Sequence, residues 1–362
     1  MIELQRCSDK EQWDDFILEN GGHPLQLWAW GQVKAEHGWK AERLFGYDDD
    51  ANIVAAAQVL IRPLPFPFRA FAYIPRGPVS ASATGVGVAS SVGASVGAGI
   101  GIDSDSDSLT QSQEFLDVLA RRMKQEYHAV ALSVEPDEVE FAKPKDWVVS
   151  TNKILSAETV LLDVTQSDSE LLAHMAKKTR QYIRKSGADV EIRRLRSLAD
   201  LKECLDIYQQ TAQRAGFNLH DLQYYRDIHN QMKDHSPIFG AYKDGKLVSF
   251  LWLAISEQTA YELYGGMDER GQELRANYAL KWYAIKKVKE WGLSRYDFGG
   301  LVAGGVTQFK HGWTDEFTTF AGTFDKPLSP FYVMWSKGLP FAKRTVHLLK
   351  RNRRKAPRSQ QN

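Results

Sequence analysis

The strongest constraint on the fold is an order of predicted elements that occurs twice along the chain. In each half, a helix is followed by a two-stranded hairpin, a further strand, a second helix and a last strand. In the first half these elements are predicted at residues 8–20, 41–65, 68–79, 112–127 and 129–136. In the second half they are predicted at residues 198–216, 237–256, 259–267, 275–292 and 295–300. The residues themselves differ, but the repeated order predicts two related α+β units in tandem.

The length of 362 residues is enough for about two domains. A strand at 159–165 and one continuous helix over 168–188 are expected to open the second half. A last strand within 320–335 is expected to pack back on the first half. The expected domains are listed here: a first domain at 1–155 together with about 319–345, a second domain at 156–318, and a basic tail at 346–362.

Residues 80–111 interrupt the first unit. This segment is rich in Gly, Ala, Ser and Val and ends in an acidic Ser-Asp run. The composition predicts a flexible inserted loop. Its glycines do not indicate a dinucleotide site, because no helix is expected directly behind them and the following acids would repel phosphate.

Charge is unevenly distributed along the chain. The formal net charge is +1, yet residues 337–362 contain nine Lys and Arg and no acid. A basic end of this kind suits a polyanion, either RNA or an anionic membrane surface. A solvated chain end explains it equally well.

The cysteine content and hydropathy exclude several classes of protein. Cys7 and Cys204 are the only cysteines, which is too few for a disulfide framework or a cysteine metal site, and no metal is expected. The first residues lack the apolar segment of a signal peptide, and no run approaches the ~18 apolar residues of a membrane-spanning helix. We therefore expect a cytoplasmic protein, with peripheral contact with the membrane left open.

Seven groups of short motifs, in a fixed order, resemble the FemABX family of peptidoglycan-bridge aminoacyltransferases. They are "WAWGQVKAEHGWK", "AYIPRGPV", "TVLLDVT" with "KKTRQYIRK", "AQRAGF" with "LQYYRDI", "ELYGGM", "RYDFGG", and "FKHGW" with "AGTFDKPL". The resemblance covers about Trp28 to Asp325, without the 80–111 insertion. It is specific because the motifs keep the order of the family.

The resemblance implies a fold and an activity. The fold is two tandem GNAT-like (acyl-CoA N-acyltransferase-like) domains, here in a compact form without a coiled-coil arm. The activity is transfer of an amino acid from aminoacyl-tRNA to the side-chain amine at position three of the peptidoglycan stem peptide. The acceptor is UDP-MurNAc-pentapeptide or lipid II, and neither a metal nor CoA nor another cofactor is required. We expect a monomer.

Lys310 and Phe309, in "FKHGW", match the catalytic lysine of the family and the residue beside it. Amide formation from an ester passes through a tetrahedral oxyanion, which a fixed positive charge stabilises. We expect Lys310 to stabilise this oxyanion or the leaving ribose oxygen, and Phe309 to stack on the terminal adenosine of the tRNA. On spacing alone, a half-buried strand lysine beside core aromatics is the better explanation of Lys310, and the family match favours the functional one.

Other residues that match positions of the family are expected to bind the acceptor or to shape its site. Lys34 matches the precursor-binding lysine of the family, and an ammonium suits a diphosphate. The second phosphate-binding base of the family is replaced by His220 here, and Arg214 is the alternative ligand. Tyr224 and Tyr264 match tyrosines that shape the site, although core aromatics with satisfied hydroxyls would give the same pattern.

Three further features have an alternative explanation. Glu135 falls where family members can have Asp and is a candidate base or ammonium anchor, or else a strand-end surface carboxylate. Arg76 either orders a Pro/Gly bend or lines the acceptor groove. The basic helical face within 177–185 could hold tRNA phosphates by counterion release, although such faces are usually only solvated.

The residues leave two alternative functions open. An acyl-CoA-dependent N-acyltransferase normally has a Q/R-x-x-G-x-G/A loop at a helix start for pyrophosphate, and the chain has no such loop. "RYDFGG" has the wrong spacing, and no helix is expected after it. A non-catalytic tRNA-binding protein is the other alternative, and Lys310 argues against it.

Overall fold

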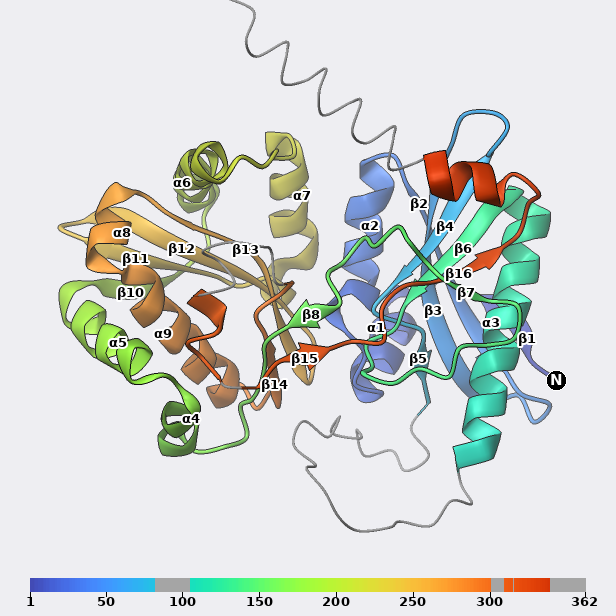
Figure 1. The fold of residues 1–362 in the computed structure, drawn as a ribbon, viewed down its shortest axis with the longest axis horizontal. Helices are drawn as coiled ribbons and strands as arrows, with labels where there is room; N and C mark the ends of the chain where they lie inside the picture. Colours follow the sequence, from blue (N-terminus) through green and yellow to red (C-terminus); the bar gives the residue numbers. More distant parts are fainter. Residues whose placement is uncertain (82–104, 301–308, 315, 339–362) are drawn as a thin grey trace, which may run out of the picture.

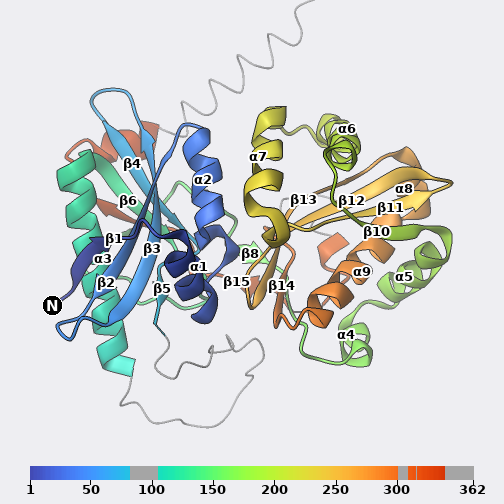
Figure 2. The ribbon, with the colours of Figure 1, turned by 180° about the vertical axis from the view of Figure 1, so that it is seen from behind.

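The two predicted units form two β-sheets that lie side by side. The structure is a computed structural model and describes residues 1–81, 105–300, 309–314 and 316–338. Figure 1 shows the first unit on the right and the second on the left, and Figure 2 shows the same arrangement from behind. The predicted α+β class is confirmed.

In the first unit, helices α1, α2 and α3 pack around the sheet in the described part of the chain. Its elements are β1 (Glu3–Arg6), α1 (Lys10–Glu19), the 3-10 turn η1 (Pro24–Gln26), α2 (Trp28–Glu36), β2 (Lys40–Tyr47), β3 (Ile53–Pro63), β4 (Ala70–Pro75), β5 (Val79–Ser80), α3 (Asp105–Tyr127), β6 (Ala129–Glu135) and β7 (Val148–Val149). Residues such as Phe115, Leu119 and Met123 of α3 are fully buried against this sheet. Their helical spacing explains why this segment forms a helix with one apolar face.

The second unit repeats the pattern with more helices. Its elements, with the strands that follow it, are β8 (Glu158–Thr159), β9 (Leu161–Asp163), α4 (Asp168–His174), α5 (Lys177–Asp189), β10 (Glu191–Leu195), α6 (Leu198–Ala215), α7 (Leu222–Met232), the 3-10 turn η2 (Lys233–His235), β11 (Ile238–Lys243), β12 (Lys246–Ile255), β13 (Thr259–Met267), α8 (Glu269–Leu274), α9 (Ala276–Glu290), β14 (Arg295–Asp297), β15 (Thr318–Thr319) and β16 (Phe324–Pro327). The β11–β12 hairpin turns at Asp244 and Gly245, as expected, and both have positive φ.

The strand orders of the two sheets correspond. Among the described residues the first sheet runs β1-β2-β3-β4-β6-β16-β7 and the second runs β10-β11-β12-β13-β14-β9. Each sheet contains one parallel pair, β4 with β6 and β13 with β14, joined through a long helix. The strand beside that pair comes from outside the repeat in both cases: β16 follows the second unit, and β9 precedes it. The halves are therefore equivalent in topology as well as in element order.

Two predicted segments differ from the structure. Helix α3 begins at Asp105, so residues 105–111 are helical and not part of a loop. Residues 82–104 of the expected insertion, and the expected tail at 346–362, lie outside the described residues.

The predicted helix over 168–188 is wrong, because it is two helices separated at Met175 and Ala176. The Arg180 guanidinium donates to the Leu172 carbonyl at 3.0 Å and also to that of Met175, so it satisfies the carbonyl end of α4. The Ala176 amide donates to the Gly312 carbonyl instead of continuing the helix.

The two units share a continuous apolar contact. Trp30 and Val33 of α2 lie in the same buried cluster as Tyr224, Tyr225 and Ile228 of α7. Below this contact, β8 and β15 pair antiparallel where the chain enters and leaves the second unit (Figure 1). The corresponding helices α2 and α7 thus form the interface between the units.

Candidate functional site

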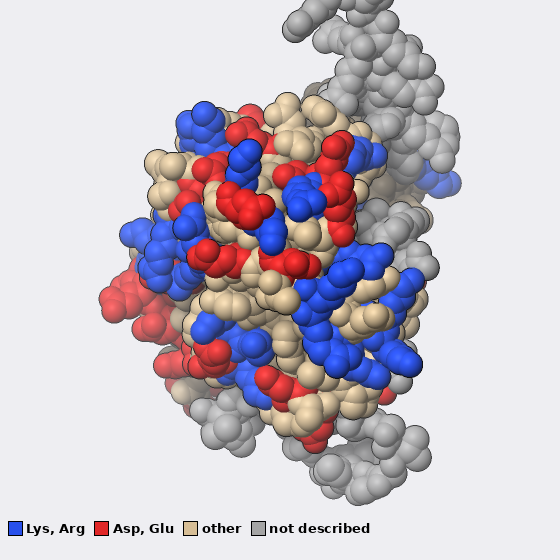
Figure 3. Space-filling view, turned by 90° about the vertical axis from the view of Figure 1, so that its left-hand side faces the viewer, with Lys and Arg blue, Asp and Glu red and all other residues tan. Residues whose placement is uncertain are grey.

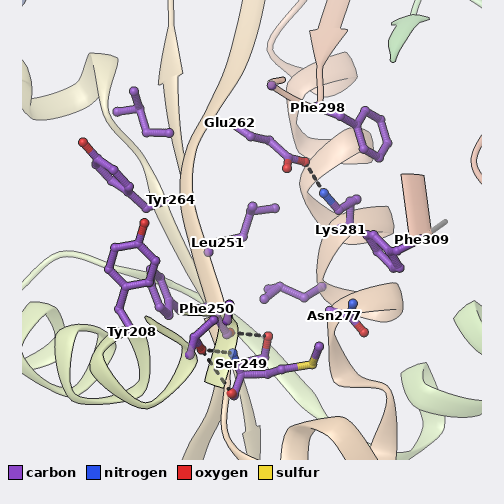
Figure 4. Close-up of a pocket in the computed structure, with 18 of the residues that line it drawn as sticks. Tyr208, Ser249, Phe250, Leu251, Glu262, Tyr264, Asn277, Lys281, Phe298 and Phe309 are labelled. Carbon is purple, nitrogen blue, oxygen red and sulfur yellow. Dashed lines mark hydrogen bonds and ion pairs between the residues drawn. The ribbon is translucent and has the colours of Figure 1, made fainter. Parts of the chain in front are cut away.

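The second unit contains a cavity of about 440 Å³ between its sheet and the surrounding helices. Its wall comes from α6, β12, β13 and α9 and from the backbone after β14 (Figure 4). Four of the residues expected at the site line it: Arg214, Tyr264, Phe309 and Lys310. The lining is mainly apolar, so a charge placed in it interacts more strongly than it would in water.

The Lys310 side chain is only 6% exposed. Its ammonium donates to three backbone carbonyls, Phe298 at 2.5 Å, Gly299 at 2.8 Å and Gly300 at 2.9 Å. The pKa of Lys310 is lowered to about 8, chiefly by burial and also by the nearby Lys281 ammonium, against the opposing effect of the acids Glu262 and Asp297. Lys310 is therefore a buried cation that is held by the backbone at the wall of the cavity.

Phe309 presents its ring to the same cavity and is half-buried. It packs edge-on against Tyr278, with 4.8 Å between ring centroids, and against Trp313 at 5.9 Å. The ring is held by neighbours on one side and lines the cavity on the other, as a stacking surface requires.

A buried ion pair in the cavity wall was missed by the sequence analysis. Lys281 of α9 donates to Glu262 Oε1 of β13, and the Tyr296 hydroxyl donates to the same oxygen at 2.7 Å. The Lys281 ammonium also lies 4.4 Å from the centre of the Phe298 ring. Glu262 is the only acid in the 259–267 strand, and Lys281 interrupts the buried face of α9. These two interruptions were the signal that could have found the pair.

A second group of expected residues meets at the interface of the units. Lys34 donates a 2.6 Å hydrogen bond to the hydroxyl of Tyr224 and lies 4.4 Å from the centre of the Trp30 ring. Burial lowers the pKa of Lys34 to about 8, and Arg62 adds to this effect. Among the described residues, no carboxylate forms an ion pair with Lys34. Its charge is thus open to an anionic ligand.

Tyrosines connect this group to the cavity. Tyr224 is 2% exposed, and burial raises its pKa to about 12. Burial, together with the charge of Tyr224 and a hydrogen bond to it, raises the pKa of Tyr264 well above its ordinary value. Because Tyr264 also lines the cavity, the two sites adjoin.

His220 and Arg214 occupy different places. The exposed His220 ring stacks on Tyr224 at 4.0 Å, and burial and the charge of Lys34 lower the pKa of His220. It lies beside Lys34, outside the cavity lining. Arg214 lies at the cavity, where its guanidinium donates to the carbonyl of Met267. The structure therefore separates the two candidate phosphate ligands.

Glu135 lies in the first unit, away from the cavity lining. Its carboxylate accepts from the Tyr73 hydroxyl, the Thr323 hydroxyl at 2.8 Å, and the amides of Ile154 and Leu155. Both oxygens are used, and the side chain is buried. This geometry favours a role in fixing the connection between the units. It corrects the expectation of a surface carboxylate.

Arg76 is also buried at the junction. Its guanidinium lies 3.8 Å from the centre of the Phe320 ring and donates weakly to the Ser156 carbonyl at 3.4 Å. Asp137 faces it at 3.9 Å and forms a second ion pair with Arg295 of β14. Arg76 has a positive φ and precedes the Gly77–Pro78 bend, in line with the structural explanation.

The basic face expected on residues 177–185 is exposed on α5. Lys177, Lys178, Arg184 and Lys185 are solvent-exposed, while Thr179 and Ile183 are buried beneath them. Figure 3 views this end of the second unit and shows a cluster of Lys and Arg beside a region of mixed charge.

Two other kinds of feature are absent from the described part of the chain. No group of His, Cys, Asp and Glu there could hold a metal ion. Within the same residues, every helix is too short or too polar to cross a bilayer.

The fold and the cavity define a class of protein. The family model described as "Acetyltransferase (GNAT) domain" matches residues 173–311. The crystal structure of FemX superposes with a TM-score of 0.74, covering 92% of this chain and 100% of that chain at 18% identity. The chain therefore has the tandem GNAT-like acyltransferase fold.

The FemAB family model matches residues 9–85. The lipid II:glycine glycyltransferase of Staphylococcus haemolyticus (strain JCSC1435) is 22% identical over 91% of this chain and 94% of that protein. The UDP-N-acetylmuramoylpentapeptide-lysine N(6)-alanyltransferase of Weissella viridescens is 23% identical over 88% of this chain and 94% of that protein. The resemblance to the FemABX family is thus confirmed, and the chain is similar to these two enzymes over most of its length.

Proposed function

We propose that this chain transfers an amino acid from aminoacyl-tRNA to the position-three side-chain amine of a peptidoglycan precursor. One observation carries the proposal: the buried Lys310 ammonium and the Phe309 ring share the wall of one largely apolar cavity. The names of the glycyl- and alanyltransferase relatives support lipid II or UDP-MurNAc-pentapeptide as the acceptor.

The proposed reaction needs no metal or cofactor. The neutral acceptor amine attacks the ester carbonyl, and a C–N bond forms as the carbonyl oxygen becomes an oxyanion. Collapse breaks the bond to the ribose oxygen, which takes up the proton that the amine loses. The products are an amide and uncharged tRNA.

Lys310 would stabilise the oxyanion by exchanging one of its carbonyl partners. The hydrogen bonds to Phe298 and Gly299 are buried, whereas the one to Gly300 is only partly buried. An oxyanion that replaces the Gly300 carbonyl would receive a charge-assisted hydrogen bond in an apolar site. Phe309 would stack on the terminal adenosine.

The acceptor and the tRNA body would bind outside the cavity. Lys34 and His220, which flank Tyr224, would hold the precursor phosphates on the side of the cavity lined by Tyr264. The exposed lysines of α5 would contact tRNA phosphates. In this proposal Glu135 remains a candidate ammonium anchor only if its hydrogen bonds rearrange.

We propose a monomeric cytoplasmic protein with the domain limits given above. Peripheral membrane contact would use the basic residues after 337 and the exposed Phe331, Val333 and Met334 that precede them. Apolar side chains next to a basic segment suit an anionic lipid surface. This contact would bring the site to lipid II.

The test is a transfer assay. The protein is mixed with a set of charged tRNAs and either UDP-MurNAc-pentapeptide or lipid II, and the acceptor is examined by mass spectrometry. We expect a mass gain of one amino acid residue that depends on charged tRNA. Binding of tRNA without any mass gain would favour the non-catalytic alternative.

An acyl-CoA-dependent N-acyltransferase is the alternative function, because the acetyltransferase (GNAT) family matches residues 173–311 in the second unit. Against it, the turn after β13 places Asp268 and Glu269 at the start of α8, and Asp268 itself accepts from the Gly271 amide. Acids at this helix start would repel a diphosphate. Consumption of acetyl-CoA without tRNA would reverse this preference.

A further inference from the structure

Glu262 presents a carboxylate oxygen that the fold leaves unused. Oε1 accepts from both Lys281 and Tyr296. Among the described residues, no hydrogen bond to Oε2 is formed, and Oε2 is not fully buried. Figure 4 shows the carboxylate beside the Lys281 ammonium at the cavity wall.

An ion pair with only a structural role would not be expected to leave one carboxylate oxygen of Glu262 without a donor beside a cavity. The side chains of Glu262 and Lys281 are 11% and 7% exposed, so both ions have lost most of their hydration. Desolvation of this kind is costly and is offset only when the remaining lone pairs are also satisfied. An apolar cavity beside Oε2 leaves that condition unmet until a donor enters it.

The cavity wall also carries a negative group, Glu262, near a positive group, Lys310. Glu262 is close enough to Lys310 to raise the pKa of that ammonium. One wall therefore offers a negative group, and a neighbouring part of the same wall offers a positive one. An aminoacyl ester in its transition state has the complementary pair, because its α-ammonium and its oxyanion are attached to adjacent carbon atoms.

We propose that Glu262 binds the α-ammonium of the aminoacyl group and so selects amino acids over acyl groups that lack a cation. This assignment rests on the proposed function and names the group of the donor that the cavity recognises. Lys281 and Tyr296 are positioning residues, because they fix Oε1 and turn Oε2 toward the cavity. Lys310 remains the partner of the oxyanion.

The acceptor amine is the weaker candidate for this position. A carboxylate stabilises the protonated form of an amine, whereas the acceptor must lose its proton to attack the ester. The α-amino group of the donor has no such requirement. With an ordinary pKa of about 8, it is largely protonated at neutral pH.

The experiment compares donors that differ only at this group. Alanyl-tRNA and glycyl-tRNA are paired with lactyl-tRNA and glycolyl-tRNA, in which a hydroxyl replaces the α-ammonium. The wild-type protein should prefer the aminoacyl donor in kcat/KM by about tenfold to a hundredfold, as for one charge-assisted hydrogen bond. In Glu262→Gln the preference should fall to about threefold or less, because the aminoacyl rate drops and the hydroxyacyl rate is retained.

The matched control is Glu257→Gln, a carboxylate exposed at the turn between β12 and β13. It should keep the wild-type preference. An unchanged preference in a folded Glu262→Gln protein would overturn the inference. Equal use of both donors by the wild-type protein would also overturn it, without depending on the stability of any variant. A wild-type protein that uses neither donor but consumes acetyl-CoA would instead reject the proposed function.

Discussion

The Lys34 ammonium of α2 donates a 2.6 Å hydrogen bond to the Tyr224 hydroxyl of α7, so one polar contact joins the corresponding helices of the two units. The first unit contains a similar contact away from this interface. Lys40 donates a 2.6 Å hydrogen bond to Tyr127 and lies 4.6 Å from its ring centre. The interface contact differs because no carboxylate accompanies Lys34 in the described structure, whereas Glu42 lies 3.6 Å from Lys40.

Replacing Lys34 is expected to weaken acceptor binding. Lys34→Met should raise the KM for UDP-MurNAc-pentapeptide about tenfold or more, because a charged hydrogen bond to phosphate is lost, and kcat should change little. Steady-state kinetics with varied acceptor measures both constants. Lys40→Met is the matched control and should leave both unchanged. A fall in kcat at constant KM would place Lys34 in the chemical step instead.

Replacing Lys310 should affect both catalysis and stability. Lys310→Met should lower turnover by about two to three orders of magnitude, as for loss of an oxyanion donor. It also removes the ammonium shared by the Phe298, Gly299 and Gly300 carbonyls, of which Gly299 keeps the Thr159 hydroxyl as a donor, so the free energy of unfolding should fall by about 1–3 kcal/mol. Turnover is measured at saturating acceptor below the melting temperature of the variant. Normal turnover would exclude the proposed role.

The pH dependence of turnover should report the charge of Lys310. Burial lowers its pKa from 10.5 to about 8, so the charged form predominates below pH 8. We expect single-turnover rates to fall as the pH rises through about 8. Lys310→Arg, which stays charged, should lack this descending limb even if it is slower. The same pKa makes the folded protein bind fewer protons than the unfolded chain between about pH 8 and 10.5, so stability should rise with pH there.

The buried ion pair between Asp137 and Arg295 should stabilise the junction of the units. Burial by itself would raise the pKa of Asp137, but Arg295, His23 and Arg76 lower it below 3.8. The contribution of this group is therefore present above pH 3.8 and is lost as the pH falls through the lower, folded-state pKa. Asp137→Asn should reduce the free energy of unfolding at pH 7 by about 3–5 kcal/mol.

Chemical denaturation at pH 7 and pH 3 measures this effect. The difference between wild type and Asp137→Asn should be smaller at pH 3, because the contribution of the carboxylate declines as the pH falls below 3.8 toward its lower folded-state pKa. Asp168→Asn is the control, because Asp168 pairs with Lys289 at 3.4 Å on the surface and its loss should cost less than about 1 kcal/mol. Equal effects of the two substitutions would mean that the junction does not depend on this pair.

The sequence predicted the fold because both sheets depend on strong local patterns. Apolar residues on both sides of the Asp244–Gly245 turn predicted the β11–β12 hairpin. The short "RYDF" segment before two glycines predicted β14. The break at Met175 could not be predicted in this way. It depends on Arg180, which caps α4 from the next helix, and on the distant Gly312 carbonyl.

The site was predictable only where a family motif marked it. The motifs indicated Lys310, Phe309 and Tyr264, and the structure places all three at one cavity. Glu262 begins the motif "ELYGGM" but was assigned no role, and Lys281 lies in none of the motifs. Their ion pair joins a strand to a helix, between residues 19 positions apart in the chain. A pattern along one element cannot show such a contact, because each charge alone looks like an interruption of an apolar face.

The strand β16 has a consequence for how the protein is made. It pairs with β6 at one edge and β7 at the other, although the whole second unit separates it from them in the chain. During translation, the first sheet therefore has a gap until residue 327 has left the ribosome, by which time the second unit has already been synthesised. Truncation before Phe324 would leave the edge of β6 exposed, so the first unit cannot be expressed on its own as residues 1–155 with a complete sheet.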